Sequence, residues 1–357
     1  MRQASKNAYL DMNSLISIQI LRAVAAWLLV YHHEYALLSI RHFQFNQQLG
    51  YFGVDIFFVI SGFIMFYSLA NREYGAKEFF VKRLIRIVPA YWFYTLLMVL
   101  LSWVYAKEFS YTDWNLNTLI ASLFFIITKN PSGHIGYFPL LTVGWTLSFE
   151  MFFYAWLSLC IFAFGKFRFW ACTITLLVLP LIWDKYWIYG LSTKLLYEFA
   201  FGIVLAHGYL KLRNARPRLL YVLGIALLSF LALLSQIDIN NVDGGMFDLQ
   251  RSLSACLLIS SALCFELALL KIKINAFRLL KYLGDTSYST YLVHLLVIGV
   301  FRHYFGKQDS ELGELLLLFT TSLTIFAISH LSYQYIEIGL LFKILKRKLV
   351  GVSGLPT

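Results

Sequence analysis

Residues 21–35 read LRAVAAWLLVYHHEY, an apolar stretch interrupted by Arg22 and, eleven positions later, by His33. Ionisable side chains are costly at membrane depth, so they usually face a bundle interior and mark a functional site. Eleven residues are close to three helical turns, which places the two side chains on one face, roughly 16 Å apart along the axis. The stretch predicts a membrane helix that lines a polar path with a cation near one end and an imidazole near the other.

The composition of the chain supports a membrane environment. Of the 357 residues, 59% are hydrophobic and only 14% are charged, and the mean hydropathy is +0.67. These values lie outside the range of soluble globular domains. The formal charge of +11 is typical of basic cytoplasmic loops, so no nucleic-acid partner is expected. The four cysteines fall in apolar segments without paired spacing, which predicts packing residues and no metal site.

About 20 predominantly apolar residues span a bilayer. An eleventh apolar run, 117–128, is too short, and we expect it to be a re-entrant or interfacial segment. The predicted fold is an all-α integral membrane bundle of about ten transmembrane helices, forming one transmembrane domain over residues 1–357 with no fused soluble domain. The ten segments are 15–38, 51–70, 87–106, 145–164, 169–187, 193–210, 219–237, 251–270, 284–303 and 313–342.

The basic residues set the expected orientation of these spans. With ten spans, 21 of the 30 Lys and Arg residues fall on one side of the membrane and eight on the other, while Arg22 lies inside the first span. Because Lys and Arg favour cytoplasmic loops, both the N- and C-termini are expected in the cytoplasm. Counting 117–128 as a span would scramble this asymmetry.

This topology places several ionisable groups at the depth of His33. Asp55, Glu150 and Glu198 all fall in the outer third of their segments, which predicts one shared polar pocket. An imidazole can take a proton from a hydroxyl, and Asp55 or Glu150 could fix its tautomer. The alternative is that these groups only hold helices together. His32 competes with His33 for the pocket, because adjacent residues lie about 100° apart around a helix.

The segment between the second and third spans, expected to be a loop, carries Lys82, Arg83 and Arg86. Arginine offers forked donors to phosphate oxygens, which is compatible with a phosphorylated cofactor. The alternative is ordinary contact with lipid phosphates at a helix end. Ser61 and Gly62 lie mid-membrane in FFVISGF, where small residues permit close packing and could also clear room for a ligand.

The ninth span presents another polar face. Ser287, Tyr291 and His294 recur at i, i+4 and i+7, so they share one side of a helix. For His294, a core histidine bonded to a neighbour is at least as reasonable as a direct catalytic role.

Four motifs resemble the membrane-bound acyltransferase 3 family, beside the interval between Arg22 and His33: GVDIFFVISGF, RLIR, GWTLSFEMFFY and LGDTSYSTYLVH. They are most similar to the branch that acetylates exopolysaccharides and other surface glycans. The resemblance implies acyl transfer from an acyl-CoA, usually acetyl-CoA, to a carbohydrate hydroxyl. It favours His33 over His32. The family positions fall on Arg22, His33, Asp55, Ser61, Gly62, Arg83, Arg86 and Glu150.

One departure from the family pattern lies at the end of the last span. The family often closes that helix with Glu-x-Pro, whereas this chain has Glu337, Ile338 and Gly339.

These inferences predict an O-acyltransferase in the bacterial cytoplasmic (inner) membrane. CoA would dock on Arg83, Arg86 and Lys82, and its arm would pass Arg22. His33 would act as general base, or less favourably as a transient acyl carrier. The oxyanion donor stays open among Tyr154, Trp145 and Ser148.

The expected partners are membrane lipid and a glycan or lipid-linked saccharide, with the oligomeric state open. The alternatives are a glycolipid transporter or flippase, and a structural subunit of a polysaccharide assembly complex. Buried charges and a re-entrant segment also occur in transporters, but a transporter has no need of an arginine pair for a CoA phosphate.

Overall fold

A computed structural model of the chain describes residues 15–41, 47–71, 75–109, 113–131, 137–183, 192–212, 248–269 and 275–339. In these ranges the chain is helical, apart from turns, short irregular segments and one isolated antiparallel bridge between Lys129 and Tyr137. The α-helices are α2 (Ile16–Leu37), α3 (Gln47–Asn71), α4 (Ala76–Val104), α5 (Leu116–Leu123), α6 (Trp145–Phe164), α7 (Arg168–Ile182), α8 (Leu196–Leu212), α10 (Leu249–Cys264), α11 (Glu266–Leu269), α12 (Asn275–Asp285), α13 (Ser287–Phe305) and α14 (Glu311–Ser332).

Two of the apolar segments match their helices closely: 15–38 becomes α2 and 145–164 becomes α6. The third segment differs, because α4 begins at Ala76, well before the predicted start at residue 87. The prediction that 76–86 is a loop is therefore wrong. Glu78 in the first turn pairs with Lys82 at 2.6 Å, the i, i+4 spacing that stabilises a polar helix surface, and hydropathy does not detect such a turn. As a result, Arg83 and Arg86 project from a helix.

The run at 117–128 forms only the eight-residue helix α5, followed by irregular backbone. Eight residues rise about 12 Å, too little to cross a hydrocarbon core of about 30 Å, so the segment does not span, as predicted. Asn115 and Thr118 form a capping box at its start. Tyr91 donates to the carbonyl of Ser122 at 3.1 Å, and Trp92 donates to that of Leu123 at 2.8 Å. These bonds fasten α5 to the side of α4.

Four helical runs among the described residues are long and apolar enough to cross a membrane: Leu49–Ala70, Ala76–Val104, Thr142–Ile182 and Glu311–Glu337. The run Thr142–Ile182 contains two predicted spans. Gly165, with φ of +47°, separates α6 from α7 there, and the two helices pack against each other. The chain is thus a membrane protein. The ten-span count and the cytoplasmic termini stay predictions, and the predicted span 219–237 lies outside the described residues.

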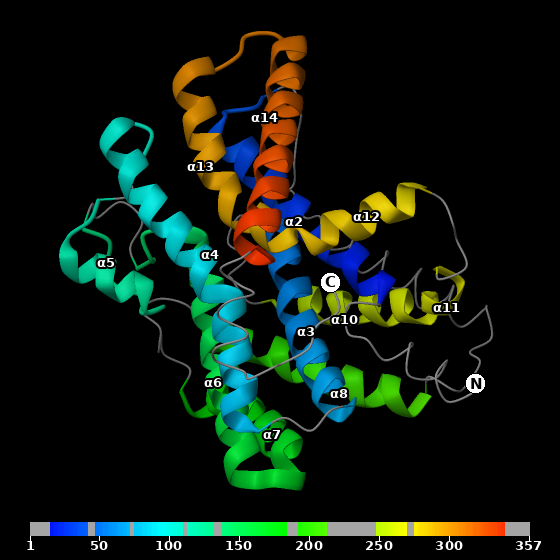
Figure 1. Cartoon of the computed structure of the whole chain (residues 1–357). Coiled ribbons are helices and arrows are strands. Elements are labelled where there is room, and N and C mark those ends of the chain that lie inside the picture. Colours follow the sequence, from blue (N-terminus) through cyan, green and yellow to red (C-terminus); the bar gives the residue numbers. More distant parts are fainter. Residues whose placement is uncertain are drawn as a thin grey trace.

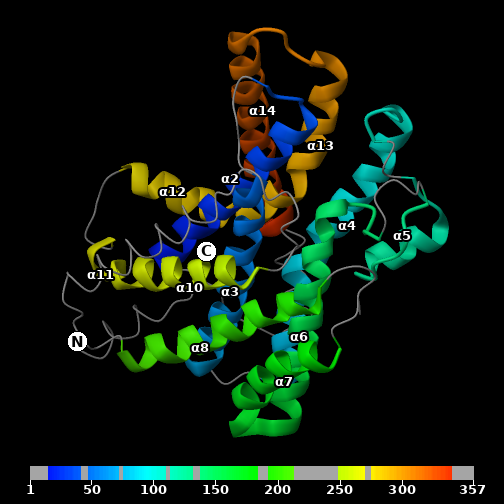
Figure 2. The ribbon, with the colours of Figure 1, turned by 180° about the vertical axis from the view of Figure 1, so that it is seen from behind.

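The helices are not ten near-parallel rods. In Figure 1, α13 and α14 stand side by side at one end, while α8, α10 and α12 run in a direction transverse to them. The view from behind in Figure 2 shows the same arrangement. Helix α3 runs through the centre and packs against α2, α8 and α10. This central position brings its mid-membrane motif against several helices at once.

Helices α3 and α8 touch backbone to backbone through two glycines. A Cβ added to Gly62 would lie 2.1 Å from the carbonyl oxygen of Phe199, and one added to Gly202 would lie 2.1 Å from that of Val59. Real Cβ atoms do not approach this closely, so both positions require glycine. The cofactor-binding role predicted for Gly62 is not supported by this position, because the residue faces α8 instead of a cavity.

We expect Gly62→Ala and Gly202→Ala each to destabilise the protein by at least about 2 kcal/mol, because rigid backbone atoms must move apart. The measurement is the thermal unfolding midpoint of the detergent-solubilised protein. Gly208→Ala, on the same helix α8, has nothing within 4 Å of its added Cβ and serves as the matched control. Equal midpoints for all three variants would contradict the close crossing.

Candidate functional site

One cavity of about 120 Å³ opens between five helices. Each of α2, α3, α4, α6 and α13 contributes to its wall, and the wall mixes charged, hydroxyl and aromatic side chains. Eight residues predicted from the sequence line it: Arg22, Ser61, Arg83, Arg86, Glu150, Tyr154, Ser287 and Tyr291. The cavity therefore gathers most of the predicted polar residues, from helices far apart in the chain, in one place.

Three arginines form the cationic part of the cavity. Arg86 is exposed, whereas Arg83 and Arg22 are half-buried. Arg22 donates to the side chain of Gln19 at 3.3 Å, and the Arg83 guanidinium lies over the rings of Phe79 and Tyr154, at 5.6 and 6.0 Å from their centroids. Because exposure falls from Arg86 to Arg22, the arginines lead from the surface into the bundle.

Lys82 lies apart from this cluster. It does not line the cavity, and its ammonium group pairs with Glu78 on the same helix. The structure thus separates Lys82 from the two arginines with which it was grouped.

Glu150 lies with the arginines and not with His33. Its carboxylate accepts a hydrogen bond of 2.5 Å from Ser61, and it interacts electrostatically with Arg86 and Arg22. Tyr154 joins the same group through hydrogen bonds to Ser61 and Glu150. A carboxylate beside these arginines lowers the net charge of the cavity wall.

Ser287 offers an unsatisfied group to the cavity. Its side chain is fully buried, and its hydroxyl has no hydrogen-bond partner among the described residues. Buried polar atoms are normally paired, so a hydroxyl on a cavity wall that no described residue satisfies is available to a ligand in the cavity. By contrast, the Tyr291 hydroxyl contacts Thr146 at 2.6 Å and also donates to the Val143 carbonyl.

At its other end the cavity reaches Leu29, and His33 follows one helical turn later on α2. The Nδ1 atom of His33 lies 2.9 Å from the carbonyl oxygen of Leu29 and 3.2 Å from Nε2 of His294. His294 comes from α13 and is fully buried, while His33 keeps part of its surface exposed. The two imidazoles form a pair that connects α2 to α13.

The carbonyl neighbours assign the protons of this pair. A carbonyl oxygen only accepts, so Nδ1 of His33 carries a hydrogen toward Leu29. Nδ1 of His294 faces the Thr290 carbonyl at 3.3 Å and carries a hydrogen for the same reason. Nε2 of His294 is then an acceptor, and it shares the single Nδ1 hydrogen of His33 with the Leu29 carbonyl. The remaining nitrogen of His33, Nε2, keeps its lone pair and can act as a base.

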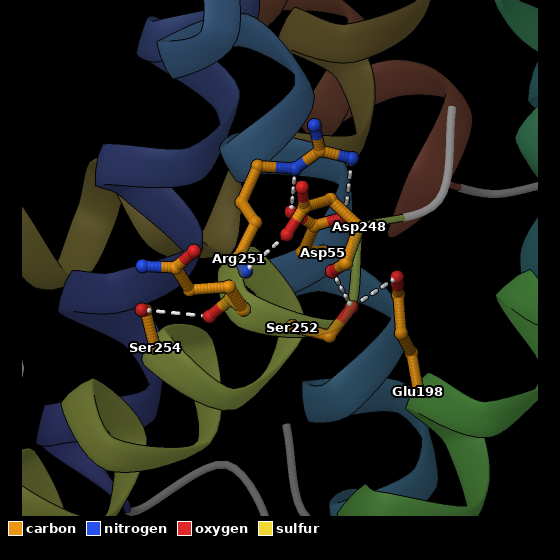
Figure 3. Close-up of polar contacts among 7 residues, drawn as sticks. Asp55, Glu198, Asp248, Arg251, Ser252 and Ser254 are labelled. Carbon is orange, nitrogen blue, oxygen red and sulfur yellow. Dashed lines mark hydrogen bonds and ion pairs between the residues drawn. The ribbon is translucent and has the colours of Figure 1, made fainter. Parts of the chain in front are cut away.

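Asp55 is not the partner of His33. Arg251 Nε donates to its carboxylate, and Arg251 Nη2 lies 3.4 Å from its second oxygen (Figure 3). Glu198 joins the cluster by accepting from Ser252 at 2.8 Å, and both carboxyls are fully buried. The predicted shared pocket is therefore wrong in part: matched depth did not bring Asp55, Glu150 and Glu198 to His33, because depth does not fix where a side chain points around its helix.

Arg251 is the first residue of the predicted span 251–270 and was not predicted as a site residue, yet it is only 2% exposed. It lies at the start of α10, behind the N-cap Asp248, whose side chain accepts from the Arg251 backbone amide at 2.8 Å. Its guanidinium also lies 5.3 Å from the centre of the Tyr51 ring. A signal for this burial was present in the sequence: Arg251 lies at the edge of an apolar segment, three residues after Asp248, a residue type that often caps a helix.

The other proposed oxyanion donors do not face the cavity. The ring of Trp145 packs edge-on against Phe58 and Phe149. Ser148 lies 3.5 Å from the carbonyl oxygen of Gly144 on its own helix. Of the three candidates, only Tyr154 lines the cavity, and it belongs to the group around Glu150.

The arrangement combines an anion-attracting entrance with an unprotonated imidazole nitrogen beyond its inner end. Forked arginine donors suit phosphate oxygens, and a neutral imidazole suits removal of a proton from a hydroxyl. Among the described residues, no three His, Cys, Asp or Glu side chains are placed to share a metal ion. The chemistry that the side chains themselves support is anion binding joined to proton transfer.

Comparison with known proteins gives independent information. A family model described as an acyltransferase domain matches residues 15–333. The exopolysaccharide production protein ExoZ of Rhizobium meliloti (strain 1021) is 35% identical over 259 residues, covering 71% of this chain and 78% of ExoZ. "Putative O-acetyltransferase SACOL0978" of Staphylococcus aureus (strain COL) is 29% identical over 347 residues, covering 85% of this chain and 55% of that protein. No solved structure matches.

We expect the pair of Asp55 and Arg251 to be strongly coupled. Asp55→Asn or Arg251→Gln alone should cost about 3–5 kcal/mol of stability, because each leaves an uncompensated buried charge. The double variant should be more stable than either single variant. A double-mutant cycle on the thermal unfolding midpoints measures this coupling, and additive effects would contradict the pairing.

Proposed function

Because the chain belongs to this family of membrane acyltransferases, we propose that it is an O-acyltransferase that moves an acetyl or other short acyl group from acyl-CoA to a hydroxyl of an exopolysaccharide or another surface glycan. The observation that carries the proposal is that one cavity extends from the arginine cluster to Leu29, one helical turn before His33. The resemblance to ExoZ supports a glycan acceptor. Family membership also favours an enzyme over the alternative of a transporter.

In the proposed donor site, the phosphates of CoA bind Arg83 and Arg86, and the pantetheine arm passes Arg22 toward His33. Arginine matches phosphate oxygens because its guanidinium donates two parallel hydrogen bonds. The unpaired Ser287 hydroxyl supports the proposal, since an amide or carbonyl group of the arm would satisfy it. Acyl-CoA enters here as the donor substrate, and no metal takes part in the proposed reaction.

In the proposed reaction, Nε2 of His33 removes the proton of the acceptor hydroxyl as its oxygen attacks the thioester carbonyl carbon. The C–O bond forms, the C–S bond breaks, and the CoA thiolate leaves and takes up a proton. His294 holds the His33 ring in the tautomer that leaves Nε2 free, a role that the sequence analysis gave to a carboxylate. The proton-transfer step is the reason that the imidazole sits beyond the inner end of the cavity.

The orientation of the enzyme follows from the donor. Acyl-CoA is cytoplasmic and the acceptor lies on the surface side, so we place the protein in the bacterial cytoplasmic membrane with the arginines facing inward. The acceptor glycan would approach the half-exposed side of His33.

We expect His33→Ala to lower acyl transfer from radiolabelled acetyl-CoA to a membrane glycan fraction by at least about 100-fold, because the general base is lost. His32→Ala serves as the control and should retain most activity. His294→Phe should lower the turnover rate roughly tenfold with little change in the KM for acetyl-CoA, because orientation and not binding is lost. Loss of activity only in the His32 variant would overturn the assignment of the base.

Arg86→Gln should raise the KM for acetyl-CoA by about tenfold or more, since a charge-assisted phosphate contact contributes about 1.5–3 kcal/mol. Lys82→Gln is the matched control on the same helix, because Lys82 points to Glu78 and does not line the cavity. Its KM should stay within about twofold of the parent value. Equal effects of the two substitutions would indicate a general surface charge and not a donor site.

A further inference from the structure

Helix α14 ends in a π-helical turn, Tyr333–Glu337. The turn is closed by a hydrogen bond of 3.0 Å from the Ile338 amide to the Tyr333 carbonyl, an i to i+5 spacing. Such turns are rare and often occur at functional sites. This one carries Glu337, which is 9% exposed, to the inside of the protein, whereas its neighbours Tyr335 and Ile338 are exposed.

The π-turn explains why Glu337 faces inward. Ser289 on α13 lies 2.8 Å from the Ser332 hydroxyl and also donates to the Glu337 carboxylate. Ser332 and Glu337 are five residues apart, and in a regular α-helix they would point about 140° away from each other. A turn with i to i+5 bonding stacks them, so both reach one serine. The extra residue in the π-turn thus brings the Glu337 carboxylate to Ser289.

The Glu337 carboxylate does not line the cavity, but it lies within electrostatic reach of two of its arginines. Arg86 and Arg22 are the cations that interact electrostatically with Glu337, and the π-turn packs against α4, the helix that carries Arg86. Next to Arg86, the Tyr288 hydroxyl donates to the Ile87 carbonyl at 2.8 Å and fastens α13 to α4. In the described part of the chain, no ion pair joins Glu337 to either arginine. Glu337 therefore occupies none of the guanidinium donors of these two arginines.

We propose that Glu337 is a second internal counter-anion of the arginine site, beside Glu150. It balances Arg22 and Arg86 when no ligand is present, and it opposes the negative charge of a bound phosphate group. The site then holds an anionic ligand firmly enough to orient it and releases it after the reaction. That the ligand is CoA rests on the proposed function, whereas the counter-anion role requires only that the arginines bind an anion.

A purely structural role of Glu337 and a counter-anion role predict opposite changes in ligand affinity when Glu337 loses its charge. Loss of a structural contact weakens ligand binding or leaves it unchanged. Loss of an opposing charge strengthens binding, because one repulsive interaction with the phosphate disappears. A unit charge about 10 Å away, at an effective dielectric constant of about 20, changes affinity on the order of tenfold. The direction of the change in affinity therefore separates the two roles.

The experiment is calorimetric titration of the detergent-solubilised full-length chain with CoA and, separately, with inorganic pyrophosphate. Glu337→Gln removes the charge and keeps an acceptor for Ser289. We expect it to bind each anion about tenfold more tightly than the parent chain and to unfold at a lower temperature without ligand. Glu314→Gln is the matched control, because Glu314 is also a buried carboxylate, lies on α14 and accepts from the Arg41 amide at 2.9 Å without lining the cavity. Its affinities should not change.

The possible results test the counter-anion role of Glu337 separately from the proposal that CoA is the donor. Unchanged or weaker binding by Glu337→Gln overturns the counter-anion role, even if the parent chain binds CoA. If the parent binds pyrophosphate but not CoA, and Glu337→Gln binds pyrophosphate more tightly, the counter-anion role stands and the CoA donor falls. If the parent binds neither anion, both proposals fall.

Discussion

The buried charged side chains of the described residues depend on partners within the protein, because the surrounding hydrocarbon supplies neither water nor counter-ions. Arg251 meets Asp55 directly, and Glu266 accepts the Ile16 and Ser17 amides at 2.7 and 2.9 Å at the start of α2. The arginine cluster of the cavity also has internal carboxylates near it, but in a different arrangement. There, Glu150 and Glu337 interact electrostatically with Arg22 and Arg86, and among the described residues no direct ion pair joins these carboxylates to those two arginines. The contrast separates a structural charge pair from a binding site.

The sequence was sufficient to predict eight of the residues that line the cavity, because periodicity decides which side chains share a helix face. Arg22 is three turns from His33 on α2, and Ser287 and Tyr291 are one turn apart on α13; these spacings survive in the fold. The same reasoning failed for Asp55 and Glu198. Their depth was predicted from segment position, but their rotation toward α10 depends on packing between helices far apart in the sequence, and Arg251 was not recognised as buried.

Hydropathy also did not predict two local backbone features, the early start of α4 and the π-turn at the end of α14. The polar first turns of α4 are stabilised by the pair of Glu78 and Lys82, so the helix starts before its apolar segment does. The π-turn at the end of α14 changes the rotation of Glu337 without changing the apolar pattern, so that residue seemed to matter only for a helix end. In both cases a side-chain contact, and not the average hydropathy, determines where functional groups point.

The histidine pair shows how this constraint shapes the proposed chemistry. A carboxylate beside His33 would favour the charged imidazolium, whereas His294 offers a neutral acceptor that is itself fixed by the Thr290 carbonyl. In a low-dielectric interior, a neutral partner orients the base without adding a second charge that would need its own counter-ion. The carboxylates are instead placed near the arginines, where phosphate charge would arrive. In the proposed mechanism, the arginines and carboxylates that bind phosphate are thus separate from the histidine pair that transfers the proton. This separation follows from the low dielectric constant of the membrane.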